Sequence, residues 1–228
     1  MTAPPLSLPA TAAGTDRSSA RAGAAVGVAA VVLVVAGFAL AAATEATLTS
    51  PESDVVAFYR EAPLVRTVVG GLLETTGLVL LLAFGAALSA RLAAVGWPAA
   101  AARSALTAYV AICLAPGMSA GAAALWLAHT GSTDPAVLTA LNTLRSLSYF
   151  LALVPFAVFL ACTALAGLRT AALPQWACWA ALVIAVPMVP SVAVAALGLA
   201  DVLGLLGLAW VLTVAVVLLR SPDPAVRR

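Results

Sequence analysis

The sequence predicts an all-α protein of the polytopic membrane class, a bundle of six transmembrane helices with both termini in the cytoplasm. Composition is the first observation behind this fold class: 64% of the 228 residues are hydrophobic and 9% are charged, whereas soluble domains have about 45–50% apolar and about 25% charged residues. The second observation is six apolar stretches long enough to cross a bilayer. The third is that these stretches lack the period-two alternation of a membrane β-barrel. A water-soluble enzyme and a disordered chain are therefore excluded.

The expected spans cover residues 22–44, 64–90, 101–128, 144–168, 176–199 and 202–219. About 20 apolar residues are needed to cross about 30 Å of hydrocarbon as a helix. We expect residues 1–21, rich in Pro, Ser, Thr and Ala, to form a disordered cytoplasmic tail, residues 22–220 the transmembrane domain, and residues 221–228 a second tail. The first apolar run is longer than the about 7–15 residues of a signal-peptide core, which favours its retention, although the small residues at its end would suit cleavage.

The arginines set the predicted orientation. With the N-terminus inside, eight of the eleven arginines lie on the cytoplasmic side, and only Arg60, Arg66 and Arg145 lie outside. Cytoplasmic loops are enriched in Arg and Lys, so this bias predicts cytoplasmic termini. The expected location is the cell (plasma) membrane, as a multi-pass protein of a bacterial inner membrane. The lipid bilayer is the expected partner, and binding to a partner protein or to further copies of this chain stays open. The net charge is only +2 and no basic stripe is present, so we do not expect the protein to bind nucleic acid.

The largest expected outer segment covers residues 45–63. Four residues give it one apolar side: Val55, Val56, Phe58 and Tyr59. We expect a short helix that lies on the membrane surface or on the bundle, with Ser50 or Ser53 as its N-cap and Asp54 in its first turn. A simple ordered connector is the favoured interpretation, and a ligand lid or partner surface is the alternative.

The string SPESDVVAFYREAPLVRTVVGGLLETTGLVLLLAFGAALSARL, residues 50–92, carries a family resemblance. An outer Ser/Pro-acid segment with an Ala-Phe-Tyr core enters a Gly-rich second span, which ends in a small residue followed by Leu-x-Ala-Arg-Leu. This pattern resembles a family of six-span actinobacterial membrane proteins of unknown function. The resemblance implies the six-span topology, and it implies no active site.

Glu74 is the leading candidate for a site residue. It stands about 15 Å along the second span from the start of that span, where a carboxylate must be paired, protonated or in contact with water. Thr75 and Thr76 follow it, and Asn142 and Arg145 lie near the outer start of the fourth span, from which a long side chain can reach inward. Two interpretations stay open: a ligand or ion pathway, and a structural Glu74–Arg145 pair that fixes helix register.

A G-x-S-x-G match runs from Gly117 to Gly121. In a hydrolase this motif needs a strand-turn-helix context. Here it lies within a span, and His129 is ten residues further along the same helix, about 15 Å away and beyond hydrogen-bond reach. We therefore predict that Gly117 and Gly121 are helix-packing positions, as are Gly23 and Gly27 in the first span.

No catalytic residue, metal site or cofactor is predicted, because one His and three dispersed Cys supply neither a haem nor a zinc ligand set. We expect an integral membrane protein that is not an enzyme, an accessory or partner-binding subunit. The alternative is a small transporter or substrate-binding subunit that uses Glu74, with or without Arg145.

Overall fold

The predicted six-span bundle is confirmed. The computed structural model describes residues 11–41, 46–131, 134–197 and 199–220, and these residues form helices with no β-strand among them. Six helical segments are long and apolar enough to cross a membrane: Arg21–Ala41, Leu64–Arg91, Trp97–Thr130, Pro135–Thr170, Gln175–Val194 and Val202–Arg220. The third and fourth of these are longer than the expected spans, at 34 and 36 residues.

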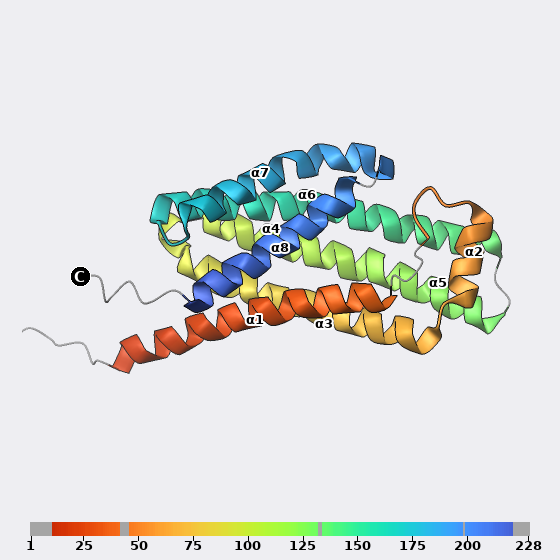
Figure 1. Ribbon diagram of the computed structural model, residues 1–228, viewed down its shortest axis with the longest axis horizontal. Helices are drawn as coiled ribbons and strands as arrows, with labels where there is room; N and C mark the ends of the chain where they lie inside the picture. Colours follow the sequence, from red (N-terminus) through yellow and green to blue (C-terminus); the bar gives the residue numbers. More distant parts are fainter. Residues whose placement is uncertain (1–10, 42–45, 132–133, 198, 221–228) are drawn as a thin grey trace, which may run out of the picture.

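The helices follow one another along the chain with short connections (Figure 1). Their bounds are α1 (Thr11–Ala41), α2 (Glu52–Glu61), α3 (Leu64–Arg91), η1 (Ala93–Val95), α4 (Trp97–Ile112), η2 (Cys113–Met118), α5 (Ser119–Thr130), α6 (Pro135–Thr170), α7 (Gln175–Ser191), η3 (Val192–Leu197) and α8 (Leu199–Arg220). Helix α1 starts ahead of the expected first span, so residues 11–21 of the expected tail are helical. The rest of that tail and residues 221–228 lie outside the described residues.

The third span is one continuous rod built from α4, η2 and α5. Its middle piece, η2, is a π-helical turn that contains Pro116. Proline has no N–H to donate and its ring crowds the preceding turn, so a regular α-helix is disfavoured at this point. The wider turn accommodates the proline without breaking the span.

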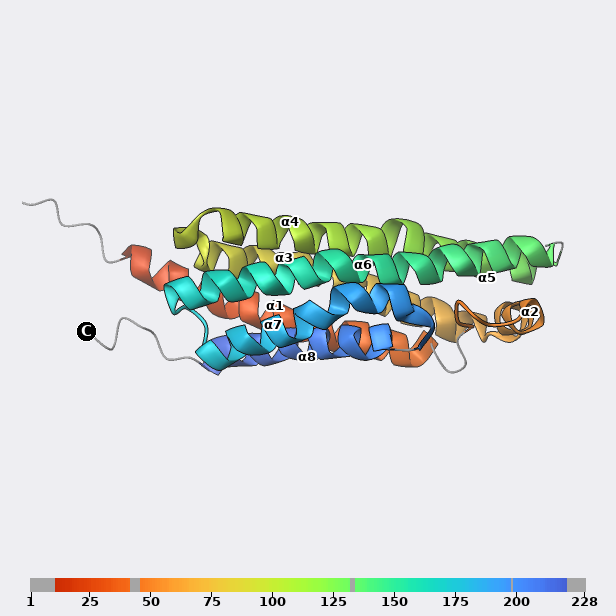
Figure 2. The ribbon, with the colours of Figure 1, turned by 90° about the horizontal axis from the view of Figure 1, so that it is seen from above.

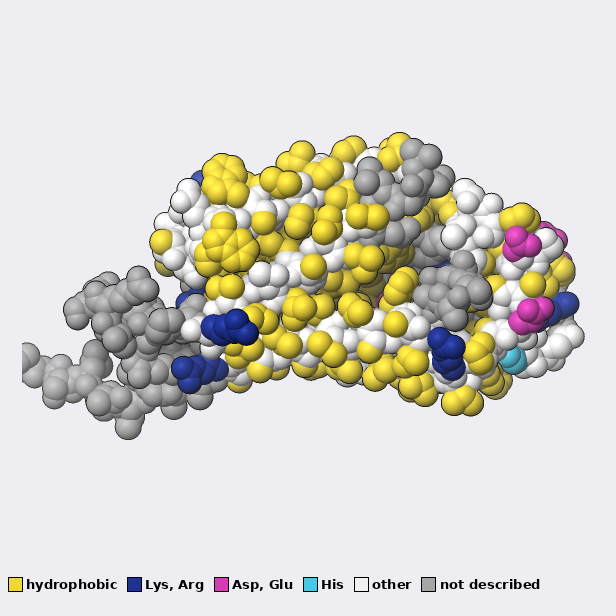
Figure 3. Space-filling view, in the orientation of Figure 1, with side chains coloured by type: hydrophobic (Ala, Val, Ile, Leu, Met, Phe, Trp, Pro, Cys, Tyr) yellow, Lys and Arg dark blue, Asp and Glu magenta, His cyan; other side chains and the backbone are white. Residues whose placement is uncertain are grey.

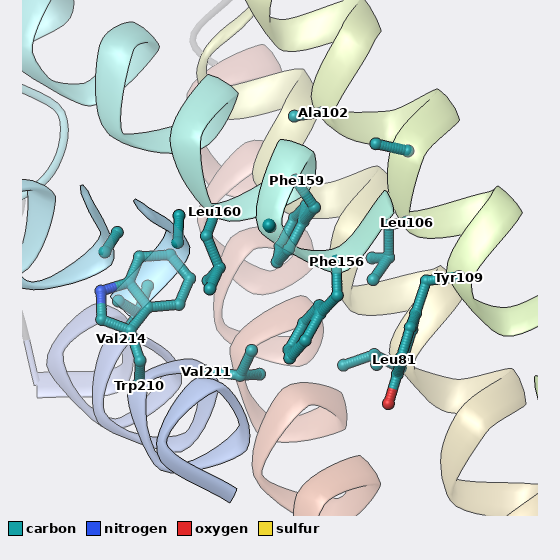
Figure 4. Close-up of a cluster of buried hydrophobic side chains, with 14 of the residues drawn as sticks. Leu81, Ala102, Leu106, Tyr109, Phe156, Phe159, Leu160, Trp210, Val211 and Val214 are labelled. Atoms are coloured by element: carbon teal, nitrogen blue, oxygen red, sulfur yellow. The ribbon is translucent and has the colours of Figure 1, made fainter. Parts of the chain in front are cut away.

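The bundle packs in neighbouring pairs, with α1 mainly on α3, α4 on α6, and α7 on α6 and α8 (Figure 2). The start of α1 and the end of α8 lie at the same end of the bundle, as an even number of crossings requires (Figure 1). Aromatic rings fill the centre, where Phe156 stacks on Tyr109 with centroids 4.6 Å apart (Figure 4). Trp210 completes this core, and its Nε1 donates a hydrogen bond of 2.7 Å to the carbonyl of Ala177.

Glycines bring α1 and α3 into backbone contact. A Cβ added to Gly37 would lie 2.5 Å from the carbonyl oxygen of Gly70 and 2.6 Å from the backbone nitrogen of Glu74. A Cβ on Gly77 would lie 2.7 Å from the carbonyl oxygen of Ala30. Small residues allow such close approach in a bilayer, where packing rather than hydrophobicity drives helix association.

Helices α5 and α6 extend beyond the rest of the bundle at the end opposite the termini (Figures 1 and 2). The 36 residues of α6 span about 54 Å, well over the about 30 Å of hydrocarbon. Helix α2 covers the extension, and a separate small core forms there from Ala46, Val55, Tyr59, Ala124, Leu125 and Leu138. We call residues 46–62, 119–131 and 134–145 the head.

The short helix expected in the outer segment is present, and it lies on the bundle: Val55 and Tyr59 are buried against α5 and α6. The predicted N-cap is wrong. The N-cap residue is Pro51, and no side chain caps the helix. Ser50 instead accepts a hydrogen bond of 2.9 Å from the N–H of Thr47 within the preceding turn, and Ser53 falls inside the first turn of α2.

Candidate functional site

Glu74 lies on the inner face of α3. Gly70, Gly77, Leu78 and Leu81 share this face and are buried, because residues three, four and seven positions apart fall on one side of a helix. The backbone of Glu74 touches Gly37 of α1. Its side chain is half-buried, so the bundle covers part of it and leaves part of it accessible.

Two residues of the third span interact electrostatically with this carboxyl group: Tyr109 of α4 and Cys113, which lies one turn further along the chain. Cys113 is the first residue of the π-helical turn. The three side chains therefore form one polar cluster, which we call the interior cluster.

The threonines after Glu74 do not join the interior cluster through a hydrogen bond. Thr76 is exposed, and its Oγ1 donates to the carbonyl of Leu72 at 2.7 Å within the same helix. Thr75 is half-buried. Within the described part of the chain, the Glu74 carboxylate accepts no hydrogen bond and makes no ion pair.

A second polar cluster lies under the head, and we call it the head latch. The Tyr59 hydroxyl donates to Asn142 Oδ1 at 3.2 Å, and Asn142 Nδ2 donates to the carbonyl of Thr47 at 3.2 Å. Arg145 Nη2 donates to the carbonyl of Ala46 at 3.1 Å and to Asn142 Oδ1 at 3.3 Å. These bonds tie α6 to the segment that leads into α2.

Burial shapes both the geometry and the protonation of the head latch. Tyr59 and Asn142 are 3% and 2% exposed. Burial removes water from the Tyr59 hydroxyl and so raises its pKa above the ordinary value of 10.0. The stem of Arg145 fits against Gly121, where an added Cβ would lie 2.9 Å from Arg145 Cδ.

The hypothesis of a Glu74–Arg145 pair is not supported, since no hydrogen bond or ion pair joins these two described residues. Arg145 extends toward the backbone of the head, whereas Glu74 interacts electrostatically with Tyr109 and Cys113. The physical reason is that free carbonyl groups at residues 46 and 47 lie within reach of the guanidinium and the Asn142 amide. Asn142 and Arg145 thus serve the head latch, and Glu74 belongs to the interior cluster.

The predicted packing glycines lie at helix contacts. A Cβ on Gly23 would lie 2.5 Å from Ala87 Cβ, and one on Gly27 would meet the ring of Phe84. Gly121 faces Arg145 as described above, while Gly117 is buried and less tightly packed, with Ser148 Cβ 3.8 Å from an added Cβ.

The G-x-S-x-G match does not assemble a Ser–His pair. Ser119 Oγ donates to the carbonyl of Ala115, and His129 Nδ1 lies 3.0 Å from the carbonyl of Leu125. Both side chains thus bond to their own helical rod. Among the described residues, no group of three or more His, Cys, Asp or Glu is placed to hold a metal ion.

Two cavities are lined by residues outside the interior cluster. One is an open groove of about 550 Å³ along α6, between Glu52 and a stripe that includes Thr139, Thr143 and Leu147. The other, of about 30 Å³, lies between Gly23, Phe84 and neighbouring residues toward the end of the bundle that carries the termini.

Charge divides the two ends of the bundle. The head exposes four acids, Glu52, Asp54, Glu61 and Asp134, with Arg60 among them. Figure 3 shows acidic side chains gathered over the head. At the end that carries the termini, the exposed charged side chains include Arg21, Arg91, Arg103, Arg169 and Arg220. The head is thus a net acidic surface among the described residues.

No family model, curated protein or solved structure matches this chain. The fold and the site define an integral membrane protein with six spans, and the function has to be argued from its two polar clusters and its head.

Sequence reasoning missed Tyr59, Tyr109 and Cys113 as polar site residues. Each stands within an apolar run, where its hydrophobic body masked its polar tip. Tyr59 was predicted only as part of an apolar helix side. One general rule could have pointed to these residues: a buried hydroxyl group needs a hydrogen-bond partner. The rule does not say which residue that partner is.

Proposed function

We propose that the protein is a non-enzymatic accessory subunit of the bacterial plasma membrane that binds a partner protein through its head. The observation that carries this proposal is the head itself, a preformed element with its own core and latch that extends past the length needed to cross the bilayer. A rigid protruding surface loses little conformational entropy on binding, which favours recognition.

The proposed partner presents a basic surface to the head. Four exposed acids against one exposed arginine supply the complementary charge, and complementary charge steers association and selects partners. The proposed orientation has both termini in the cytoplasm and the head outside. It is supported by the exposed arginines at the end that carries the termini. We also propose membership of the six-span actinobacterial family of unknown function, on the pattern of residues 50–92.

Photo-cross-linking in intact cells tests this proposal. A photoreactive residue at Asp54, exposed on α2, is expected to give a discrete protein adduct, which is lost when Glu52 and Glu61 are both changed to Lys. The matched control is a photoreactive residue at Val183, 72% exposed on the apolar face of α7, where lipid adducts are expected. The proposal is contradicted if the head cross-links to no protein, or if the same adduct still forms after Glu52 and Glu61 are changed to Lys.

A second candidate function is a small transporter coupled to the interior cluster. The observation that favours it is Glu74, a half-buried carboxyl group in a span without a hydrogen-bond partner in the described chain, because intramembrane ionisable residues mark ion pathways. Proteoliposomes with an internal pH dye test it. If the protein transports protons, the interior of the proteoliposomes should acidify, Glu74→Gln should abolish this acidification and Thr76→Val should preserve it. Equal dye signals from proteoliposomes and from liposomes without protein would exclude transport.

A further inference from the structure

We infer that the partner of the head is itself a membrane protein, and that one of its transmembrane helices packs along an exposed apolar stripe of α6. A Lys or Arg of this helix, or of the segment that continues it outside the bilayer, enters the groove beside α6 and pairs with Glu52. This inference rests on the proposed function, because it names the class of partner that the head binds.

The exposed surface of α6 is a single narrow stripe, which we call the α6 seam. Helix α6 lies between α4 and α7 (Figure 2), and the seam is the part of it that the bundle leaves uncovered. Between residues 137 and 168, every exposed residue of α6 is apolar and falls at the first or fourth position of a seven-residue repeat. The first positions are Val137, Leu144, Leu151, Val158 and Leu165, and exposed fourth positions follow three residues after four of them. This spacing is the one that fits a second helix packed alongside at a small crossing angle.

The α6 seam is too long for lipid alone to cover. From Val137 to Leu168 it runs about 46 Å, whereas the hydrocarbon is about 30 Å thick and each headgroup layer about 5–8 Å. Arg169, exposed at the end that carries the termini, marks one edge of the hydrocarbon, and about 20 residues of α6 cross from there to near Tyr149. The outer part of the seam therefore continues past the lipid tails into the head. A helix that spans the bilayer and continues outside it covers the whole seam.

A groove of about 550 Å³ continues the seam at the head. Its lining includes the seam residues Ala140, Leu144 and Leu147, and Glu52 of α2 contributes the charged group. The lining runs about 16 Å along α6, well over the about 5–8 Å of a headgroup layer. A lipid headgroup therefore does not fill the groove, and a polypeptide that follows the seam enters it without a break.

The polar groups of the groove select a cation that donates hydrogen bonds. The Thr139 hydroxyl donates to the carbonyl of Pro135 at 3.1 Å, and the Thr143 hydroxyl donates to the carbonyl of Thr139 at 2.8 Å. Each hydroxyl group has one hydrogen, so both oxygens are left as acceptors, like the carboxylate of Glu52. Lys and Arg are the side chains that combine donors, no acceptor and a positive charge, and the groove accommodates the apolar stem of either.

A second copy of this chain is a poorer occupant of the seam than a different protein. Two copies related by a two-fold axis bring the same surface of each together. Glu52 and the other exposed acids of the head would then face the acidic head of the second copy, and like charges placed opposite one another oppose association. Complementary charge therefore points to a different protein with a basic residue at this level.

Photo-cross-linking along α6 in intact cells tests the inference, with the linked peptides identified by mass spectrometry. A photoreactive residue at Leu151, 55% exposed in the middle of the seam, is expected to link to an apolar span of the same protein that Asp54 captures. One at Ala140 is expected to link to a segment of that protein that adjoins the span and contains Lys or Arg. Val183, 72% exposed on α7, is the control position, where lipid adducts are expected.

Charge variants separate the groove from the rest of the head. Glu52→Lys is expected to abolish the Leu151 adduct, and changing the basic residue of the Ala140-linked peptide to Glu is expected to restore it. Glu52→Gln removes the charge alone and should weaken the adduct in the same direction, which guards against misfolding of the Lys variant. Glu61→Lys changes an exposed acid of α2 outside the groove lining, and this matched control should keep the adduct.

Other outcomes would overturn the inference. Lipid adducts alone at Leu151, together with a protein adduct at Asp54, would show that the head binds a protein that does not pack along the seam, and the proposed function would stand. A Leu151 adduct with another copy of this chain would make the seam a homodimer interface. A Leu151 adduct that persists unchanged in Glu52→Lys would remove the ion pair from the account. Absence of any protein adduct at Asp54 would overturn the proposed function and the inference with it.

Discussion

The head latch leads to a quantitative prediction, that Asn142→Ala releases α2 while the bundle stays folded. Asn142 accepts a hydrogen bond from Tyr59 and donates one to the carbonyl of Thr47. Two net hydrogen bonds at about 1 kcal/mol each, together with a buried Tyr59 hydroxyl left without its acceptor, amount to about 2–4 kcal/mol. The loss should be local, because both bonds join α6 to residues 47–59 only.

Hydrogen exchange measured by mass spectrometry in nanodiscs resolves this local effect. The amides of residues 52–61 should exchange about 30- to 1,000-fold faster in Asn142→Ala, since about 1.4 kcal/mol corresponds to a factor of ten. Tyr59→Phe removes one bond and should give about 1 kcal/mol. The control is Thr143→Ala, whose hydroxyl bonds only to Thr139 within α6. Unchanged exchange of α2 in Asn142→Ala, or an equal change in the control, refutes the latch.

Three further predictions concern packing and pH. Gly37→Val should prevent stable folding, judged by gel filtration in detergent, because its Cβ would meet the backbone of α3, whereas Gly71→Val should be tolerated because nothing lies within 4 Å of a Cβ there. Trp210→Phe should lower the free energy of unfolding by about 1–3 kcal/mol, since the buried carbonyl of Ala177 loses its donor; a thermal midpoint equal to that of the wild type would contradict this. Burial raises the pKa of Tyr59 above 10.0, so the unfolded form binds fewer protons at alkaline pH. The stability of the head is then constant below about pH 10 and falls above it, and exchange of α2 should accelerate there less in Tyr59→Phe than in the wild type.

The fold could be predicted because the length and polarity of a span are local properties of the sequence. Six runs of sufficient hydropathy required six crossings, whatever their packing. Helix α6 is longer than the expected span of residues 144–168, because the sequence was interpreted as an outer loop up to Thr143. The helix in fact begins at Pro135, after Asp134 caps it by accepting a hydrogen bond of 2.9 Å from the N–H of Ala136. These polar side chains are buried under α2 rather than exposed at a membrane surface.

The candidate site was predictable only in part. Glu74 stood out because a carboxylate in an apolar run is costly wherever it points. Its neighbours could not be assigned, because the facing direction of Tyr109 and Cys113 depends on how α3 and α4 pack. The backbone partner of Arg145 could not be predicted either. The guanidinium binds the main-chain carbonyl of Ala46, and a backbone acceptor leaves no mark in the side-chain sequence.

The most direct test of the central claim, a head outside the cell on a bundle whose termini lie inside, is cysteine labelling in intact cells. Ser53→Cys on α2 and Ala94→Cys on η1 are exposed positions outside the six spans, at opposite ends of the bundle. A membrane-impermeant maleimide should label Ser53→Cys in intact cells and label Ala94→Cys only after the membrane is opened, with the parent protein as the control for its own cysteines. Labelling of Ala94→Cys alone in intact cells would place the head in the cytoplasm and contradict the account.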